Sequence, residues 1–439
     1  MKTWHWFISL LILGSVLTVG FLGGHPAQTY PDTGTYLRAA QELVSGDFSV
    51  GQGRRTPGYP LFIVAVGGSE QALVIAQKVA GLLTSALLFG ITMLLTKRPA
   101  LAFAVGVSYL VNLQQMFQET ALTTETLSTL SVAATVAALL LVMARLGKGQ
   151  LPTLLMLALG VLAGFAILVR PQFIFFLLLL PVMLVYAVSR LRRPTTRSFA
   201  AATLGTAPAL LMLLIWCAVV YVKVGYFTLS TQPGFGMVNH TIDYIELAPE
   251  RYAVVRDVLI KTREARMAEV GHTRNTIWYA LPEMQRVTGW SLPEASRQMQ
   301  RMCTEMFIAY PGRYAVSLAM AWRDFWTVPI FWQPESVKPP MLGTALQGLW
   351  KVEHLLLRLA NLAFVCLVVA VAVSVRVRRT VQWDAGLTAI AATVLLSSIV
   401  QALFDQGASS RYAIPTQALV VLVLMVSAAR ARQGRSEAG

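Results

Sequence analysis

Long stretches that are almost free of charged residues constrain the fold of this chain more than any other feature. The clearest are residues 151–169, 173–188, 199–222 and 385–404. Each is close to the roughly 17–25 residues that an α-helix needs to cross a bilayer. Helix is the expected structure because lipid offers the backbone no hydrogen-bond partners, whereas a helix satisfies them internally. Only 13% of the residues are charged, about half the share of a soluble domain. We therefore predict an all-α polytopic membrane protein.

Apolar segments of sufficient length recur along the chain and predict about ten transmembrane helices. Their expected ranges are 4–23, 71–96, 99–116, 122–144, 151–169, 172–189, 199–225, 359–375, 385–404 and 412–429. The first follows Lys2, as the apolar part of a cleaved signal peptide would. It is long, however, and no clear small-x-small cleavage site stands before His25. We expect a retained first span.

The basic residues between these spans give the orientation. Fifteen of them fall in short connections or at the chain ends: Lys2, Lys97, Arg98, Arg145, Lys148, Arg190, Arg192, Arg193, Arg197, Arg376, Arg378, Arg379, Arg430, Arg432 and Arg435. Only Asp384 and Glu437 accompany them, whereas residues 227–341 carry 12 basic and 11 acidic residues. The net charge of +15 therefore lies on one face of the membrane, as the positive-inside rule describes. A nucleic-acid partner is not expected.

Alternation of the spans then places both termini in the cytoplasm and the long connections outside. In a bacterium this outer side is the periplasmic face of the inner membrane. The expected division is an N-terminal membrane module (1–226), an outer segment (227–341) and a C-terminal membrane module (342–439). The outer segment has helical patterns around residues 249–270, 276–288, 292–309 and 312–327.

The first outer loop, residues 24–57, contains a predicted helix. Residues 33–45 carry an apolar stripe of helical spacing made of Tyr36, Leu37, Ala40, Leu43 and Val44. This pattern is typical of an amphipathic helix on the membrane surface. Asp32 directly precedes it and has two interpretations: it caps the helix through its side chain, or it is a catalytic carboxylate.

Charged residues at the expected outer ends of the spans are the other candidates for chemistry, because charge near lipid is costly and is usually retained for function. They are Arg54, Arg55, Lys78, Glu125, Arg170, Lys223 and Arg411. Glu125 begins the fourth span, where a helix N-terminus favours an acid, or it works beside Asp32. Lys78 and Lys223 lie just inside the outer boundary, where snorkelling of the long side chain explains them.

Each arginine can be interpreted either as a structural or solvated residue or as a residue that binds an anion. Arg54 and Arg55 are either solvated loop residues or ligands of a phosphate, which the planar guanidinium fork suits. Arg170 and Arg411 each open an apolar helix, where the helix dipole disfavours a cation. That conflict favours an anionic partner for both.

No cofactor follows from the sequence. The five histidines show no metal-ligand spacing, and a divalent ion held by acids is left open. No Gly-rich phosphate loop is visible. The three cysteines, Cys217, Cys303 and Cys366, are too few for a disulfide framework.

Six short motifs follow one another in order: Asp32 with a Tyr-Leu-x-x-Ala helix after it, Arg55-Thr-Pro-Gly-Tyr-Pro60, Thr124-Glu125-Thr-Leu, Leu168-Val-Arg170-Pro171, Tyr310-Pro-Gly-Arg-Tyr314 and Arg411-Tyr412-x-x-Pro415. Together they resemble the GT-C fold glycosyltransferases, in particular the bacterial relatives of protein O-mannosyltransferases and of the aminoarabinose transferase that modifies lipid A. The resemblance covers about residues 25–415. It departs from the family at Thr33, where members often carry a second acid, and in the modest size of segment 227–341.

The resemblance implies an inverting transfer of a sugar from a polyprenyl-phosphate carrier to a lipid, glycan or protein acceptor at the outer face. It implies Asp32 as the general base, with Glu125 near the same cavity. Cations near the donor phosphate would stabilise the charge that it gains on leaving. The candidates are Arg54, Arg55, Arg170 and Arg411, with Lys78 and Lys223 behind them.

Three alternatives stay open. A polysaccharide polymerase or ligase shares the many-span plan, and we would expect more arginine and histidine chemistry in its outer loop. A lipid or sugar transporter commonly shows repeated halves, and no internal repeat is visible here. A non-catalytic membrane subunit would gain support if Asp32 and Glu125 lay far apart.

Overall fold

The computed structural model describes residues 2–22, 25–189, 196, 199, 200, 203, 205–327, 334–406 and 409–436. Within these residues the regular elements are helices, and the only extended pairing is one isolated parallel bridge between Gln28 and Ala121. Eight of the described helices are long and apolar enough to cross a membrane. The all-α prediction is confirmed, and the chain is an integral membrane protein.

The eight helices correspond to eight of the ten expected spans. They are α1 (Thr3–Leu22), α4 (Glu70–Thr96), α7 (Glu125–Gly147), α9 (Phe176–Ser189) with the preceding 3-10 turn η1 (Pro171–Phe175), α11 (Ala207–Val224), α17 (Pro340–Val373), α19 (Ala385–Phe404) and α20 (Ile414–Ser436). The other two are shorter apolar helices, α5 (Pro99–Leu110) and α8 (Thr153–Val169). Residues 199–206, where the seventh span was expected to begin, lie partly outside the described residues.

The third expected span, 99–116, is interrupted near its end. α5 ends at Leu110, and a short helix α6 (Leu113–Gln118) begins just after it. The side chain of Asn112 caps α6 by accepting a hydrogen bond from the Gln115 N–H at 3.0 Å. An N-cap at this place redirects the backbone, so the continuous span predicted there is wrong.

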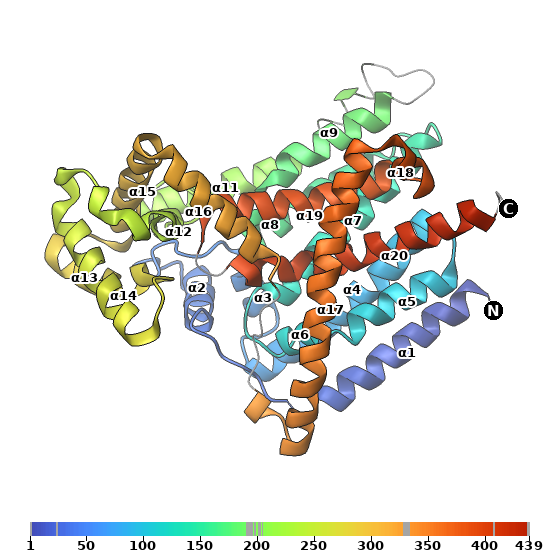
Figure 1. The fold of residues 1–439 in the computed structure, drawn as a ribbon, viewed down its shortest axis with the longest axis horizontal. Helices are drawn as coiled ribbons and strands as arrows, with labels where there is room; N and C mark the ends of the chain where they lie inside the picture. Colours follow the sequence, from blue (N-terminus) through green and yellow to red (C-terminus); the bar gives the residue numbers. More distant parts are fainter. Residues whose placement is uncertain are drawn as a thin grey trace.

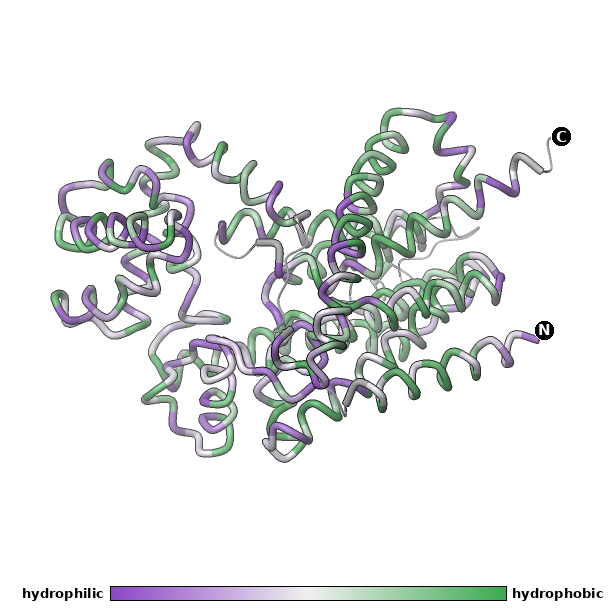
Figure 2. The backbone as a smooth tube through the Cα atoms, turned by 60° about the horizontal axis from the view of Figure 1, so that its bottom comes forward, coloured by the Kyte–Doolittle hydropathy of each residue, from purple (hydrophilic) through white to green (hydrophobic). Residues whose placement is uncertain are grey.

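The membrane helices share one apolar core, which Figure 2 shows as a run of hydrophobic colour through the bundle. α7 is the most deeply buried of the eight spans and packs against α4, α8 and α20. Its sequence is rich in alanine, serine and threonine, and small side chains let neighbouring helices approach closely. α1 is the least buried.

The outer segment forms a second apolar core of its own. It contains α12 (Pro233–Thr241), η2 (Ile242–Leu247), η3 (Glu250–Tyr252), α13 (Ala253–Val270), α14 (Thr276–Thr288) and α15 (Leu292–Ala309), followed by α16 (Pro311–Phe325), which packs on α19. After it come η4 (Pro334–Ser336) and α17. The four helices that the sequence predicts here are present as α13 to α16, whereas the boundaries of the three predicted modules remain a prediction.

The two ends of the bundle differ in what they carry. Both termini and α18 (Val375–Thr380) lie at one end, and α2 and α12 to α16 lie at the other (Figure 1). At the end that carries the termini, Arg430 donates to the backbone oxygens of Leu95 and Gln382 and pairs with Asp384. Three basic connections therefore meet on one face, as their charge predicts. The cluster Arg190–Arg197 lies outside the described residues apart from Thr196.

The first outer loop contains α2 (Thr33–Ser45), as predicted, and a second short helix α3 (Gly58–Ala65). Tyr36 and Ala40 of the expected apolar stripe are buried. Glu42 is buried too, and its carboxylate lies against the backbone at Gly51 and Gln52. This contact ties the end of α2 to the turn that leads into Arg54 and Arg55.

Candidate active site

Two coil segments bring Asp32 and Glu125 together. Gln28 accepts a hydrogen bond from the Leu122 N–H at 2.9 Å. The Thr33 hydroxyl donates to the Leu122 backbone oxygen at 3.0 Å. The chain that precedes α2 is therefore held beside the chain that precedes α7, so the starts of these two helices face one place.

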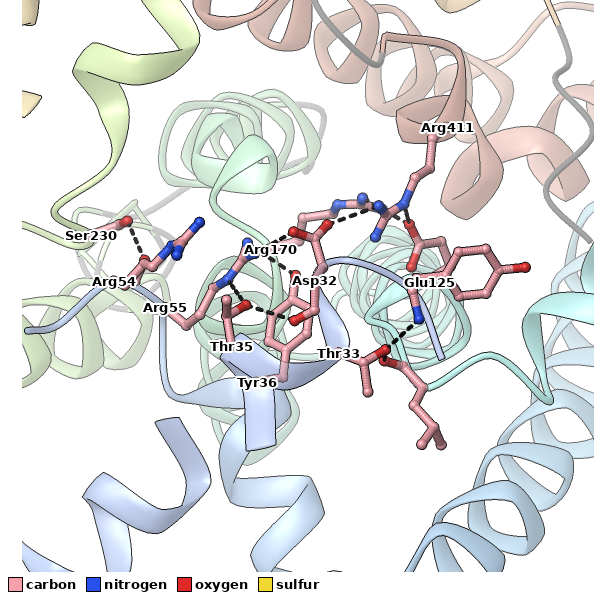
Figure 3. A network of polar contacts seen from close by, with 12 residues as sticks. Asp32, Thr33, Thr35, Tyr36, Arg54, Arg55, Glu125, Arg170, Ser230 and Arg411 are labelled. Carbon is pink, nitrogen blue, oxygen red and sulfur yellow. Dashed lines mark hydrogen bonds and ion pairs between the residues drawn. The ribbon is translucent and has the colours of Figure 1, made fainter. Parts of the chain in front are cut away.

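At this place three arginines and two carboxylates form one connected network (Figure 3). Asp32 Oδ1 accepts from Arg55 Nη2 at 2.5 Å, and Asp32 Oδ2 accepts from Arg411 Nη1 at 2.9 Å. Glu125 Oε1 accepts from Arg170 Nη2 at 3.1 Å and from Arg411 Nε. Arg411 thus bridges the two acids. The network unites residues that the sequence singled out from five separate segments.

Arg170 reaches the network because proline follows it. A residue before proline disfavours the helical region, and Arg170 ends α8 with an extended backbone. Its guanidinium lies over the ring of Tyr412 at 4.5 Å, a cation–π contact. The break between the expected spans 151–169 and 172–189 therefore falls at Arg170 and Pro171. Tyr412 stands next to Arg411, and its part in the site was not predicted.

Arg55 is fixed by neutral groups as well as by Asp32. Its Nε donates to Thr35 Oγ1 at 2.8 Å, its Nη1 donates to the Tyr36 hydroxyl at 3.4 Å, and its guanidinium lies 4.4 Å from the Tyr36 ring centre. Tyr36 was expected only in the apolar stripe of residues 33–45, and Thr35 was not among the predicted site residues. Thr35 and Tyr36 follow Asp32 by three and four residues, and residues so spaced lie on one face of a helix. This spacing could have predicted that both lie near Asp32.

Asp32 does not cap α2 with its side chain. It occupies the N-cap position, but it makes no side-chain cap hydrogen bond and its carboxylate goes to the two arginines. The capping interpretation is therefore wrong. Burial opposes ionisation of this carboxyl, but the charges and hydrogen bonds of Arg55 and Arg411 outweigh burial and hold the pKa of Asp32 well below its usual range. The side chain remains 35% exposed, so it is reachable from outside.

Glu125, unlike Asp32, is fully buried: the Glu125 side chain has 0% exposure. A buried carboxylate is tolerated only with close partners, and here both are arginines. Glu125 is the first residue of α7, where the helix N-terminus favours an acid, and it also shares Arg411 with Asp32. Tyr30 is a further neighbour that sequence reasoning missed. Its burial, and then the charge of Glu125, raise the pKa of Tyr30 to about 12, so its phenol keeps its proton at neutral pH.

Arg54 lies next to Arg55 but has no ion-pair partner within the part of the chain that the structure describes (Figure 3). Its guanidinium lies 5.1 Å from the ring centre of Trp278 on α14. The Gln232 side-chain oxygen, in the amide orientation that satisfies both groups, accepts from Arg54 Nη2 at 3.2 Å. Burial and the nearby Arg55 charge lower the pKa of Arg54 to about 10, which leaves it protonated at neutral pH. It is a half-buried cation that joins the first outer loop to the outer segment, not a solvated loop residue.

The two candidate lysines lie apart from this network. Lys78 is 2% exposed and its Nζ contacts Glu119 Oε2 at 3.1 Å and the Met116 backbone oxygen at 3.3 Å. It forms a buried ion pair, so the snorkelling interpretation is wrong for this residue. Lys223 is exposed and donates to the Gly46 backbone oxygen at 3.0 Å.

Within the described residues, no group of three or more histidine, cysteine, aspartate or glutamate side chains is arranged to hold a metal ion. The two acids of the network face guanidinium groups instead. The geometry therefore presents fixed positive charge around one reachable carboxylate, an arrangement that can bind a phosphate and accept a proton.

No protein-family model matches the chain, and no curated protein matches it. Among solved structures, the chain is similar to the crystal structure of ArnT from Cupriavidus metallidurans bound to undecaprenyl phosphate. The two are 14% identical in sequence, the match covers 98% of this chain and 78% of the ArnT chain, and the TM-score is 0.39.

Proposed function

We propose that this chain is an inverting glycosyltransferase that moves a sugar from a polyprenyl-phosphate carrier to a lipid, glycan or protein acceptor at the outer face of the membrane. The observation that carries the proposal is the network in which Arg411 bridges Asp32 and Glu125. The network lies at the start of α2, at the end of the bundle opposite the termini (Figure 1). The positive-inside pattern supports this end as the outer side, which in a bacterium is the periplasmic side of the inner membrane.

The charge of the network suits this donor. Its three guanidinium groups and two carboxylates leave a net charge of +1. A sugar phosphodiester carries one negative charge, and the phosphate that leaves as a monoester carries more. Arg54 adds a further cation beside the network. The positive charge of the site is therefore larger than the single negative charge of the bound donor. Such a site stabilises the departing phosphate, which gains negative charge, more than it stabilises the bound donor, and this difference is what lowers the barrier.

The difference in exposure supports different roles for the two acids. Asp32 is 35% exposed and Glu125 is 0% exposed, so only Asp32 can meet an acceptor hydroxyl. In the proposed reaction the acceptor oxygen bonds to the anomeric carbon on the face opposite the phosphate. The bond from that carbon to the phosphate oxygen breaks, its electron pair stays on the phosphate, and the acceptor proton passes to Asp32. Glu125 positions Arg170 and Arg411 and takes no proton.

The geometry gives the alternatives less support. A non-catalytic subunit would leave Asp32 and Glu125 apart, whereas they share one arginine. A transporter would gather charge near the bilayer midplane, whereas this network stands at one end of the bundle. A polymerase or ligase would use outer-loop histidines, but His240 is buried and bonded to Ser317.

The test is a donor screen on the purified protein in nanodiscs, with detergent-extracted membranes as the source of acceptor. Polyprenyl-phosphate sugars of several kinds are supplied one at a time, and release of free polyprenyl phosphate is followed with the anomeric configuration of the product. The proposal predicts release that requires the extract, with inversion. Retention of configuration contradicts it. Movement of sugar or lipid across proteoliposomes without any release favours the transporter.

A further inference from the structure

The three arginines of the network differ in what holds them. Arg55 has two neutral partners on α2, Thr35 and Tyr36, in addition to Asp32. Arg170 lies against the Tyr412 ring as well as pairing with Glu125. Within the described residues, the Arg411 guanidinium has hydrogen-bond partners only on Asp32 and Glu125.

This difference in hydrogen-bond partners determines which arginine can leave its carboxylate and bind an incoming anion. Moving Arg55 would break hydrogen bonds to a hydroxyl and a phenol that a phosphate on its other side does not replace. Moving Arg411 exchanges one anionic partner for another, so the lost charge-assisted bond is replaced by one of the same kind. Arg411 also stands on η5 (Ser409–Ala413), a short 3-10 turn in front of α20, and not inside a long helix.

Asp32 is the group that such an exchange would affect most. Each of its oxygens accepts from a different arginine, Oδ1 from Arg55 and Oδ2 from Arg411. A carboxylate held by two cations is a weak base, and its basicity rises when one cation leaves. General-base catalysis works best when the base is matched to the working pH, a condition that Asp32 does not meet while both arginines hold it.

Resting on the proposed function, we propose that the donor phosphate takes Arg411 away from Asp32, and that Asp32 accepts the acceptor proton only after this exchange. Arg411 is then the positioning residue through which donor binding prepares the base. Arg55 stays on Asp32 and keeps it oriented. The donor must bind first, because the base is restrained until the phosphate has arrived.

The exchange has a thermodynamic consequence that needs no acceptor. If the phosphate and Asp32 compete for Arg411, then Asp32→Asn removes the competitor and must tighten phosphate binding. The probe is undecaprenyl phosphate, titrated into the full chain in nanodiscs. The proteins are wild type, Asp32→Asn, Arg411→Gln and the double variant. The expected result is about twofold to fivefold tighter binding by Asp32→Asn, the scale of a partly exposed charge pair.

The double variant separates exchange from simple repulsion. Repulsion between Asp32 and the phosphate does not need Arg411, so it would give the same tightening in the Arg411→Gln background. Exchange predicts that the tightening disappears there and persists in Arg411→Lys, which keeps a cation. Asp47→Asn serves as the matched control, because Asp47 is an exposed acid of the same loop; it should leave the affinity unchanged.

Each outcome is decisive. Equal tightening in both backgrounds, or no tightening by Asp32→Asn, overturns the exchange and leaves the proposed transferase standing. Failure of the folded wild type to bind undecaprenyl phosphate overturns the donor class and the exchange with it. Melting temperatures of all variants, read from tryptophan fluorescence, show which proteins are folded. If Arg411→Gln is not folded, Arg411→Met, which also removes the charge, takes its place in the single and double variants.

Discussion

The Arg411 guanidinium donates to Asp32 Oδ2 at 2.9 Å although 379 residues separate the two in the sequence. The first outer loop and the start of the last membrane helix therefore close the same site. Glu125 stands on the other side of the same guanidinium. Changes at any of these positions should have effects that depend on how deeply each is buried.

Glu125→Gln should destabilise the protein strongly. The side chain has 0% exposure and faces two arginines, so its neutralisation leaves buried Arg170 without a counter-charge and leaves Arg411 paired with Asp32 alone. Breaking a buried pair in this way costs about 3–5 kcal/mol. Asp32→Asn, at a side chain that is 35% exposed, should cost no more than about 1 kcal/mol. Denaturant unfolding of both variants in detergent compares them, and equal losses would contradict the different roles of the two acids.

Arg54→Gln should weaken binding of the donor phosphate without lowering stability. Arg54 has no acidic partner among the described residues and lies in a buried setting beside another arginine, so the fold gains little from its charge. We expect about a tenfold loss of affinity, typical of one charge-assisted contact, with an unchanged or higher melting temperature. Lys223→Gln is the control, since Lys223 is exposed and donates its hydrogen bond to a backbone oxygen of the loop. A melting temperature that falls with the affinity would assign Arg54 a structural role.

Lys78→Met should damage the fold and not the chemistry. Lys78 and Glu119 form a pair with 2% and 9% of their side chains exposed, and removing one partner leaves a buried charge at a cost of about 3–5 kcal/mol. Adding Glu119→Gln to Lys78→Met should restore most of the loss, because no unpaired charge then remains. Turnover per folded molecule should stay near wild type in the double variant. A large loss of turnover there would return Lys78 to the list of phosphate ligands.

The stability contributed by Asp32 should not vary across the neutral pH range. Its pKa in the folded protein lies below the usual value of about 4. An acid of this kind contributes stability fully above its unfolded pKa and loses it as the pH falls through the folded pKa. The difference in melting temperature between wild type and Asp32→Asn should therefore be constant from about pH 5 to 9 and shrink only in stronger acid. A midpoint near neutral pH would mean that the arginines do not hold Asp32 as the structure indicates.

Much of the fold could be predicted because hydrophobic length and loop charge are local properties. Eight expected spans, α2 and the four helices of the outer segment follow from periodicity and composition alone. The break at Asn112 was missed because one capping side chain outweighed an apolar run. The burial of Glu42 was missed because it depends on backbone groups of a later turn.

The candidate site was predictable as a set of residue types and not as a geometry. Asp32 and Arg55 were singled out in the first outer loop, and Glu125, Arg170 and Arg411 as charges at the outer ends of spans. The pairing of Arg411 with both acids joins segments hundreds of residues apart, and no local pattern encodes it. Lys78 has the same sequence signal as the arginines, but its partner Glu119 holds it in a separate buried pair, which only the packed structure reveals.

The most direct test of the central claim compares wild type and Asp32→Asn in a single-turnover assay with a lipid-linked sugar that wild type consumes. Asparagine keeps the size of the side chain, and Asp47→Asn controls for the loss of an outer-loop charge. The account predicts that Asp32→Asn is folded, binds the donor at least as tightly as wild type, and releases polyprenyl phosphate at least about a hundredfold more slowly. Release at the wild-type rate by folded Asp32→Asn would contradict the account, because Asp32 would then not be the base.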